Sequence, residues 1–253
     1  MELYGLLGYP LGHSFSARYF ADKFEQLGRE AQYVNFEYPS VEEALTDLLQ
    51  REELKGFNVT IPYKQQILPY LQAISPEAQQ IGAVNVVKVL RDASGQPQWV
   101  GYNSDVLGFV QSFRNLCPLS LADSQALVLG TGGASKAVVY GLQSLGFTTQ
   151  SVSRRPQEGV WTYEQLTPEV LAAYKIIVNC TPLGMYPQVD ACPDLPYEAL
   201  TESHYLFDLV YNPEVTLFLK QGLQRGAKVK NGLEMLHLQA EAAWNIWTAS
   251  DCE

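Results

Sequence analysis

The feature that most constrains this chain is a short apolar run, residues 126 to 129, which leads directly into Gly130-Thr131-Gly132-Gly133-Ala134 and then into a helical pattern. A strand, a glycine turn and a helix in this order are typical of dinucleotide-binding folds. The turn would present several backbone N–H groups at a helix N-terminus, where the helix dipole favours a pyrophosphate. Ser135 stands where a third glycine is usual, so the motif alone is equally compatible with an ordinary tight turn. The flanking strand and helix favour nucleotide binding.

The end of the next predicted strand indicates which nucleotide. NAD-binding folds normally carry Asp or Glu about 20 residues after the glycine turn, to hold the ribose hydroxyls. No acidic residue occurs between Gly130 and Gln157, and Ser153-Arg154-Arg155 stands at that position. A guanidinium fork suits the 2′-phosphate that distinguishes NADP from NAD. The sequence therefore favours NADP, and the alternative is a loop with two solvated arginines.

Apolar runs and helical patterns alternate along both halves of the chain, which predicts two α/β domains. A length of 253 residues accommodates one large domain or two moderate ones. The first domain, residues 1–103, is mixed α/β and includes an antiparallel hairpin around the turn at 92–95. The second, residues 104–232, is a Rossmann-like doubly wound fold. The tail, 233–253, carries a broad apolar helix face and is expected to return to the first domain.

Charge and cysteine content exclude several classes of function. The chain has 17 Lys and Arg against 27 Asp and Glu, a net charge of −10, so no nucleic-acid partner is expected. The cysteines form no CxxC pair and the histidines no HExxH motif, which argues against a metal site. No apolar run approaches the ~18 residues of a membrane span, and the first residues lack a signal-peptide pattern. We therefore expect a soluble, cytoplasmic protein without a membrane partner.

Several polar positions suggest a site in the first domain. Lys64 follows the carboxyl end of a predicted strand, where ligands of open α/β sheets bind, and such a lysine can protonate a developing alkoxide. Asp105 lies at the inferred domain junction and would orient that ammonium if the two groups meet. Asn85 suits a hydroxyl, and the pair Ser14 and Ser16 at a helix start suits a carboxylate. Each position also has a simpler interpretation: Lys64 as a surface charge, Asp105 as a helix cap, Asn85 as a turn residue, and the serine pair as another helix cap.

These motifs, taken together, resemble the shikimate dehydrogenase family along the whole chain. The matching segments are GYPLGHSFS (8–16), GFNVTIPYK (56–64), IGAVNVV (81–87), GYNSD (101–105), GTGGASKA (130–137), SRR (153–155), NCTPLGM (179–185), DLVYNP (208–213) and NGLEMLHLQA (231–240). The resemblance implies a reversible, NADPH-linked reduction of 3-dehydroshikimate to shikimate, a step in the synthesis of chorismate and the aromatic amino acids. It also implies that the first domain and the tail bind the substrate and that the second domain binds NADP.

The resemblance further implies a role for each matching residue. The catalytic pair is Lys64 and Asp105. The substrate contacts are Ser14, Ser16, Thr60, Asn85, Tyr211 and Gln239. The cofactor contacts are Gly130, Gly132, Gly133, Ala134 and Ser135 in the turn, Ser153, Arg154 and Arg155 around the adenosine phosphate, and Thr181, Met185, Gly232 and Met235 near the nicotinamide. Hydroxyl and amide groups dominate the substrate set, as a small polyol carboxylate requires.

The chain departs from the usual family pattern at four positions, Ala17, Ser104, Val106 and Ser153. Val106 adds a β-branched side chain beside the predicted catalytic aspartate, where glycine is usual. Three alternatives stay open at this point: a quinate/shikimate dehydrogenase with relaxed substrate or cofactor choice, a catalytically silent NADPH-binding regulator, and a methylene-tetrahydropterin dehydrogenase. The sequence predicts a small-molecule substrate and leaves open whether the protein is a monomer or a homodimer.

Overall fold

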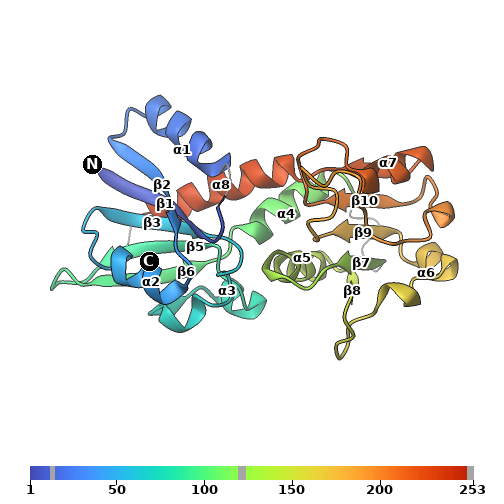
Figure 1. The fold of residues 1–253 in the computed structure, drawn as a ribbon, viewed down its shortest axis with the longest axis horizontal. Helices are drawn as coiled ribbons and strands as arrows, with labels where there is room; N and C mark the ends of the chain where they lie inside the picture. The colour runs from blue at the N-terminus through green and yellow to red at the C-terminus, as the bar shows by residue number, and fades with distance from the viewer. Residues whose placement is uncertain (12–14, 119–123, 250–253) are drawn as a thin grey trace. The chain divides into compact units, whose positions relative to one another are not determined.

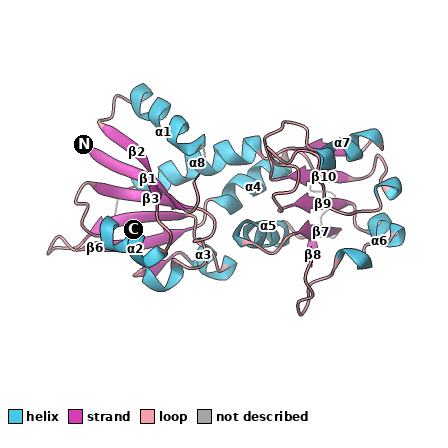
Figure 2. Cartoon of the chain, viewed as in Figure 1, coloured by secondary structure: helices cyan, strands magenta, loops and turns pink. Residues whose placement is uncertain are grey.

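The computed structural model describes residues 1–11, 15–118 and 124–249, and the ribbon in Figure 1 traces them. The chain divides into two compact units. Unit 1 takes residues Met1–Ser104 and the chain from Ala240 onward, and unit 2 takes Asp105–Gln239. The last helix, α8 (Leu233–Thr248), therefore begins in unit 2 and ends in unit 1. Both units are α/β, as the sequence predicts, with a sheet between helices in each (Figure 2).

The sheet of unit 1 is mixed and has the strand order β2-β1-β3-β5-β6-β4. Its strands are β1 (Glu2–Gly8), β2 (Ala31–Glu37), β3 (Leu54–Val59), β4 (Ala73–Ile74), β5 (Val86–Arg91) and β6 (Pro97–Tyr102). The first three run parallel to one another, and β5 pairs antiparallel with both β3 and β6. The predicted hairpin is confirmed as β5 and β6. Because β1 and β3 are parallel neighbours, the loops that follow them leave the sheet at one edge.

Helices cover both faces of this sheet. One face packs on α1 (Phe15–Gln26) and the second half of α8, through a cluster that includes Phe20, Phe24, Trp244 and Trp247. The other face packs on α2 (Val41–Leu48) and α3 (Pro76–Ile81), and a short 3-10 turn, η1 (Leu68–Tyr70), follows β3. The apolar face predicted for the tail helix is thus buried in unit 1, where Ala240 and Ala243 are fully buried.

The sheet of unit 2 is entirely parallel, in the order β11-β10-β9-β7-β8. Its strands are β7 (Gln125–Leu129), β8 (Thr148–Val152), β9 (Ile176–Asn179), β10 (Tyr205–Asp208) and β11 (Lys228–Lys230). The chain moves outward from β7 to β8 and then returns to the other side of β7 as β9. Strand order therefore reverses between β7 and β9, and ligands of doubly wound folds bind outside the carboxyl ends of the strands at such a point.

Unit 2 also buries both faces of its sheet. One face packs on α4 (Asp105–Arg114), α5 (Gly133–Ser144) and the first half of α8. The other packs on α6 (Pro168–Ala173) and α7 (Leu217–Gln224), near the short turns η3 (Tyr163–Gln165) and η4 (Tyr197–Ala199). Gly108 of α4 lies so close to α8 that a Cβ there would stand 2.7 Å from the carbonyl oxygen of Met235. Glycine is required at this crossing because the helix backbones nearly touch.

Candidate functional site

The glycine turn after β7 is shaped to accept a phosphate. Gly130 has φ +110°, a conformation that favours glycine, and its N–H donates to the carbonyl of Val152 over 2.8 Å. A Cβ on Gly130 would lie 3.3 Å from the carbonyl oxygen of Cys180, whereas one on Gly132 would meet open space. Gly132 caps the 12-residue helix α5 without any side-chain hydrogen bond to the first turn. The first-turn N–H groups are therefore left for a ligand, which fits a pyrophosphate.

Gly133 and Ala134 begin α5 as half-buried residues, and Ser135 is buried. The hydroxyl of Ser135 donates to the carbonyl oxygen of Gly132 over 2.6 Å. This side chain therefore closes the turn onto itself instead of pointing a free hydroxyl at a ligand. Serine replaces the third glycine of the motif by stabilising the same tight turn.

The end of β8 carries the predicted adenosine-phosphate contacts. Ser153 follows the strand, is half-buried, and accepts the backbone N–H of Arg155 at its hydroxyl over 3.2 Å. The side chains of Arg154 and Arg155 are exposed. Two exposed guanidinium groups next to a phosphate-shaped turn, with no acid between Gly130 and Gln157, fit the 2′-phosphate of NADP and not a free ribose diol.

The predicted nicotinamide contacts lie after β9 and β10. Thr181 follows β9, and both its N–H, over 3.0 Å, and its hydroxyl, over 2.6 Å, donate to the side-chain oxygen of Asn179. Met185 ends the same loop and is 47% exposed. Tyr211, a predicted substrate contact, follows β10 and is 37% exposed. An exposed methionine and tyrosine at the carboxyl edge of a sheet are available to a ligand.

Two further predicted contacts lie at the start of α8. Gly232 is buried, its N–H donates to the carbonyl oxygen of Val210 over 3.2 Å, and a Cβ there would collide with the carbonyl oxygen of Leu209. The side chain of Met235 is buried in the apolar core of unit 2. Gln239 is half-buried on the same helix, and its amide donates to the carbonyl of Leu236 over 3.0 Å.

In unit 1, the residues that follow β3 stand at the carboxyl edge of the sheet. Thr60 is half-buried, and its N–H donates to the carbonyl oxygen of Leu7, at the end of β1, over 2.8 Å. Lys64 is also half-buried, and its carbonyl oxygen accepts the N–H of Val84 over 2.8 Å. These backbone bonds fix the turn that carries both side chains. The structure thus gives Lys64 the position after the strand that the sequence predicts.

A polar network behind these residues was not predicted from the sequence. The hydroxyl of Tyr33 donates to the side-chain oxygen of Asn58 over 2.8 Å and is also hydrogen-bonded to Ser16. The amide of Asn58 donates to the carbonyl of Asn85 over 3.3 Å. The side chain of Asn85 in turn accepts the N–H of Ser104 over 2.7 Å. Two of the predicted substrate contacts, Ser16 and Asn85, are therefore connected through residues that carry no predicted role.

Asp105 is the first residue of α4, and its side chain is buried. Lys64 belongs to unit 1 and Asp105 to unit 2. Ser14, the other predicted carboxylate contact, lies outside the described residues. Asn58 stands inside the motif GFNVTIPYK, so its segment was recognised although its role was not. Tyr33 had no local signal beyond a strand-like pattern.

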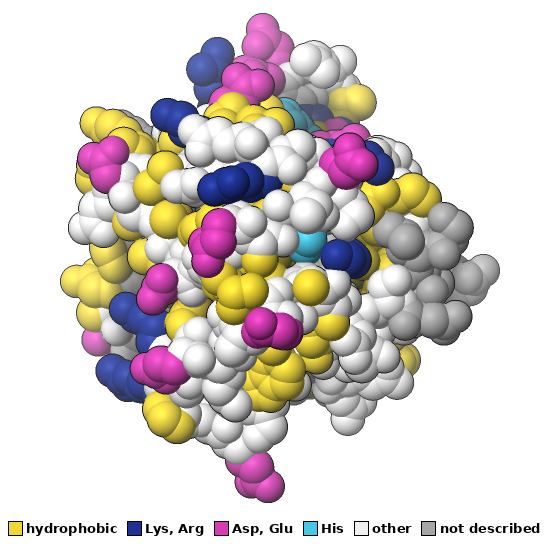
Figure 3. Space-filling model, turned by 90° about the vertical axis from the view of Figure 1, so that its right-hand side faces the viewer, with side chains coloured by type: hydrophobic (Ala, Val, Ile, Leu, Met, Phe, Trp, Pro, Cys, Tyr) yellow, Lys and Arg dark blue, Asp and Glu magenta, His cyan; other side chains and the backbone are white. Residues whose placement is uncertain are grey.

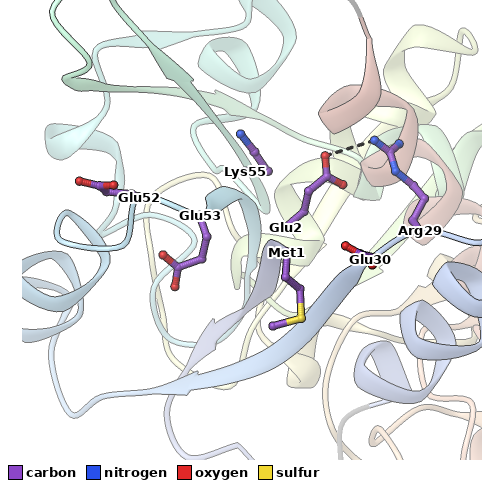
Figure 4. Close-up of a pocket in the computed structure, with 7 residues that line it drawn as sticks. All are labelled: Met1, Glu2, Arg29, Glu30, Glu52, Glu53 and Lys55. Atoms are coloured by element: carbon purple, nitrogen blue, oxygen red, sulfur yellow. Dashed lines mark hydrogen bonds and ion pairs between the residues drawn. The ribbon is translucent and has the colours of Figure 1, made fainter.

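A surface hollow of unit 1 lies away from all these residues. It has a volume of about 600 Å³ at the amino ends of β1 to β3, and Figure 4 shows its lining residues Met1, Glu2, Arg29, Glu30, Glu52, Glu53 and Lys55. Its charged side chains include one ion pair, between Arg29 and Glu2, at 3.2 Å. Surface ion pairs of this kind contribute little to the stability of the fold. The hollow is at the opposite edge of the sheet from Thr60 and Lys64, and it offers no arrangement of groups for the predicted chemistry.

Metal-ligating groups, apolar helices and surface charge determine which ligands and surroundings suit the described part of the chain. No group of three or more His, Cys, Asp and Glu side chains is placed to hold a metal ion within the ranges given above. Within those same ranges, no helix has the length and apolar character to cross a membrane. On the face drawn in Figure 3, acidic and basic side chains are interspersed. The acidic surplus is thus not gathered on that face into a field that would repel an anionic ligand.

The chain is similar to proteins of one known family. Residues 6–87 match the family model described as the shikimate dehydrogenase substrate binding domain. A shikimate dehydrogenase (NADP(+)) of Desulforamulus reducens is 34% identical over 98% of this chain and 90% of its own length. A crystal structure of shikimate 5-dehydrogenase from Thermus thermophilus, in complex with NADP(H) and shikimate, is 34% identical, with a TM-score of 0.83 over 98% of this chain and 94% of that one. The shikimate dehydrogenase of Aquifex aeolicus gives a TM-score of 0.86 at 31% identity, over 100% and 94% of the two chains.

Proposed function

The chain belongs to the shikimate dehydrogenase family, and from that premise we propose how its residues divide the work of the reaction. The protein is an NADP-dependent oxidoreductase that reversibly reduces 3-dehydroshikimate to shikimate, a step towards the aromatic amino acids. The proposal rests on two features that occur in one chain. One is a glycine turn that can accept a phosphate and is followed by two arginines, and the other is a sheet edge rich in hydroxyl and amide groups.

We propose that NADP is held at the carboxyl edge of the unit 2 sheet. The first-turn N–H groups of α5, behind Gly130 and Gly132, would bind the pyrophosphate. Arg154 and Arg155 would bind the 2′-phosphate, and Ser153 shapes their loop through its bond to the Arg155 N–H. Thr181, Met185 and Gly232 would border the nicotinamide. When bound, the nicotinamide supplies the hydride.

The substrate carries a carboxylate and several hydroxyls, and we assign its binding to groups of matching polarity. Ser16, together with Ser14, would bind the carboxylate through hydroxyl and helix N–H groups. Thr60 and Asn85 would bind ring hydroxyls, and Tyr211 and Gln239 are assigned to the same substrate. A site that pairs each hydroxyl rejects analogues that lack one by a large factor, because the unpaired buried partner is costly.

Proton transfer is assigned to Lys64. In the reductive direction, hydride addition at the carbonyl carbon generates an alkoxide, and the Lys64 ammonium donates a proton to that oxygen. The resulting amine recovers its proton from solvent before the next cycle. Asp105, the other member of the proposed catalytic pair, would accept a hydrogen bond from the same substrate hydroxyl and so orient it. In the oxidative direction, Lys64 takes the proton back from the hydroxyl.

We propose that unit 1 is the substrate domain and unit 2 the NADP domain. The match of residues 6–87 to a substrate-binding domain supports the first assignment, because that segment lies within unit 1. The compact units divide the chain after Ser104 and after Gln239, whereas the sequence suggested boundaries after 103 and 232. The second difference arises because the first two turns of α8 pack on the core of unit 2.

The experiment follows absorbance of NADPH while the purified protein oxidises shikimate or quinate with NADP or NAD. We expect rapid turnover with shikimate and NADP, and a large loss of kcat in Lys64→Ala. Lys55→Ala is the control, because Lys55 is an exposed lysine at the other end of β3. Binding of NADPH without turnover of any substrate would support the regulator alternative. Equal turnover of quinate would support the quinate/shikimate alternative.

We also propose that the enzyme acts in the cytoplasm as a monomer or homodimer. NADPH and shikimate are charged metabolites, so an enzyme that uses both must share a compartment with them. Sedimentation of the purified protein over a range of concentrations distinguishes monomer from dimer, and cell fractionation followed by immunoblotting tests the compartment. Recovery in the membrane fraction would contradict the proposal.

A further inference from the structure

A buried carboxylate that takes no part in the proposed chemistry lies at the carboxyl end of β10. Asp208 is 0% exposed, and so is Asn179, its partner in register at the end of β9. Ionised side chains are rarely buried unless a cation or several hydrogen bonds compensate. Here the oxygen atoms of Asp208 accept three hydrogen bonds, all from uncharged donors. These three bonds compensate for the burial of Asp208, and the segments that donate them show what the carboxylate holds in place.

We propose that Asp208 is the positioning residue for the nicotinamide side of the site, holding in place the backbone that carries Thr181, Met185, Tyr211 and Gly232. The inference rests on the proposed function, since it concerns residues assigned there to cofactor and substrate. It adds a group that touches neither ligand and acts through three hydrogen-bonded arms. Two arms hold the two ends of the cofactor loop, and the third reaches the segments that carry Tyr211 and Gly232.

The first arm leads to Thr181. Oδ1 of Asp208 accepts the amide N–H of Asn179 over 2.9 Å, which fixes the orientation of that side chain. The oxygen of Asn179 is thereby turned toward the loop, where it accepts both the N–H and the hydroxyl of Thr181. The hydroxyl oxygen of Thr181 also accepts the N–H of Leu183 over 3.3 Å. The start of the cofactor loop is therefore held by the carboxylate through one intermediate residue.

The second arm supports the other end of the same loop. Oδ2 of Asp208 accepts the hydroxyl of Thr216 over 2.6 Å, and Thr216 caps α7 by accepting the N–H of Leu219 over 3.3 Å. Gly184, with φ +86°, packs closely against Thr216. A Cβ on Gly184 would stand 3.4 Å from the Thr216 Cβ and 3.0 Å from the carbonyl oxygen of Ala191. Met185 follows Gly184 directly. The loop is thus held from two sides by one carboxylate.

The third arm reaches Tyr211 and Gly232. Oδ1 of Asp208 also accepts the N–H of Val210 over 3.0 Å, and the carbonyl of Val210 accepts the N–H of Gly232 over 3.2 Å. Tyr211 is the next residue in the chain. The N–H of Tyr186 donates to the carbonyl of Asn212 over 3.0 Å, which joins this segment to the cofactor loop. The segments that carry Thr181, Met185, Gly232 and the proposed substrate contact Tyr211 are therefore connected in one hydrogen-bonded network.

A side chain without oxygen atoms at this position would lose all three bonds at once, and that consequence makes the proposal testable. Misplacement of a reacting group by about 1 Å lowers catalysis by about 100-fold. A merely structural residue would affect stability alone. A positioning residue should alter local backbone order and NADPH affinity in a protein that stays folded.

The test compares Asp208→Asn with Asp208→Ala. Asparagine can keep all three bonds, because its oxygen accepts from Asn179 and Val210 and its amide can donate to the Thr216 hydroxyl oxygen. We expect Asp208→Asn to keep kcat and NADPH affinity within a few fold of wild type. For Asp208→Ala we expect kcat to fall by about 100-fold, NADPH to bind about tenfold more weakly, and amide hydrogen exchange at Thr181 and Gly232 to accelerate in the free protein.

Three further variants make the comparison decisive. Asp190→Asn removes an exposed carboxylate from the same unit and should change none of these readouts. Thr216→Val removes one arm with little change of shape and should weaken NADPH binding and speed exchange in the loop, while Thr216→Ser should restore both. The Thr216 pair decides the question if Asp208→Ala fails to fold.

Unchanged exchange and NADPH affinity in Asp208→Ala, or in Thr216→Val when Asp208→Ala does not fold, would overturn the proposal. Equal damage in Asp208→Asn and Asp208→Ala would also overturn it, because charge and not position would then be the cause. Hydrogen exchange and NADPH binding need no turnover. A wild-type protein that is silent on shikimate yet shows the expected exchange pattern would therefore refute the proposed function and leave the role of Asp208 intact.

Discussion

The hydroxyl of Tyr33 on β2 donates to the side-chain oxygen of Asn58 on β3 over 2.8 Å, across the intervening strand β1. The same hydroxyl is hydrogen-bonded to Ser16 on α1, and burial raises the pKa of the phenol well above its usual value, so it stays protonated. Its ring stacks on Phe20 with centroids 4.7 Å apart. One phenol thus ties a proposed carboxylate contact to the strand that leads to Thr60 and Lys64.

Tyr33→Phe removes this hydroxyl and keeps the stacking on Phe20. Ser16 loses a partner and the Asn58 oxygen loses its donor, at a cost of about 1 kcal/mol for a typical hydrogen bond. We expect the KM for shikimate to rise by about fivefold, with kcat less affected and NADPH affinity unchanged. Tyr38→Phe is the matched control, because it removes a tyrosine hydroxyl that donates to Asp47 over 2.7 Å elsewhere in unit 1. Equal effects on KM in both variants would contradict the assigned role.

Arg154→Ala and Arg155→Ala should each weaken NADP binding by about tenfold or more, since a hydrogen bond to a charged group contributes about 1.5–3 kcal/mol. Affinity for NAD, which lacks the 2′-phosphate, should hardly change. Isothermal titration of both cofactors at two salt concentrations measures this, and the NADP effect should shrink at high salt. Arg225→Ala, an exposed arginine after α7, serves as control. A parallel loss of NAD affinity would show that the arginines do not read the phosphate.

Val106→Gly introduces the residue that is usual in the family beside Asp105, the aspartate proposed as catalytic. The Val106 side chain is 4% exposed, so its loss should destabilise the protein by about 1.5–3 kcal/mol, and glycine in a helix adds about 0.5–1 kcal/mol. Leu107→Gly isolates the glycine effect, because Leu107 is 49% exposed. Urea unfolding measures both. A variant Val106→Gly that is as stable as Leu107→Gly and has a higher kcat would show that valine narrows the site instead.

Most of the fold was predictable from the sequence because it depends on local patterns. Alternating apolar runs and helices predicted two α/β folds, and the spacing of small and aromatic residues in α8 predicted the face now buried at Ala240, Ala243 and Trp247. The short elements β4 and α3 were missed, since two and six residues carry too little periodicity to recognise.

The site was predictable wherever a motif stands beside a strand end, as for Lys64 and the glycine turn. Contacts between segments far apart in the chain were not. Nothing local to Tyr33 indicates that its hydroxyl meets Asn58, 25 residues away, and the pairing of Asn179 with Asp208 depends on β9 and β10 lying in register. Ser135 illustrates a different limit of prediction from sequence. Its place in the glycine motif was recognised, but only the structure shows that its hydroxyl donates to the carbonyl oxygen of Gly132.

Asp208 also makes the stability of the protein depend on pH. Burial raises the pKa of Asp208 to about 6, although its bonds from Thr216, Val210 and Asn179 act in the other direction. In the unfolded chain the value is about 3.9. Between pH 6 and pH 4 the folded protein therefore binds this proton while the unfolded chain does not, so Asp208 makes the protein more stable as pH falls through that window and less stable as pH rises through 6. The full difference is about 3 kcal/mol.

Other groups titrate in the same range, so the contribution of Asp208 is measured as the difference in stability between a variant and the wild type. Asp208→Asn removes this titration, and its stability relative to wild type should increase from pH 4 to pH 7 by up to about 3 kcal/mol. Cys180 and Tyr197 feel the Asp208 charge, but both have raised pKa values and stay neutral throughout. Urea midpoints at several pH values measure the difference, and Asp190→Asn should give a flat line. If the stability of Asp208→Asn relative to wild type does not change with pH, the carboxylate titrates as an exposed one does. If that relative stability falls as pH rises, the hydrogen-bond partners of Asp208 hold it ionised.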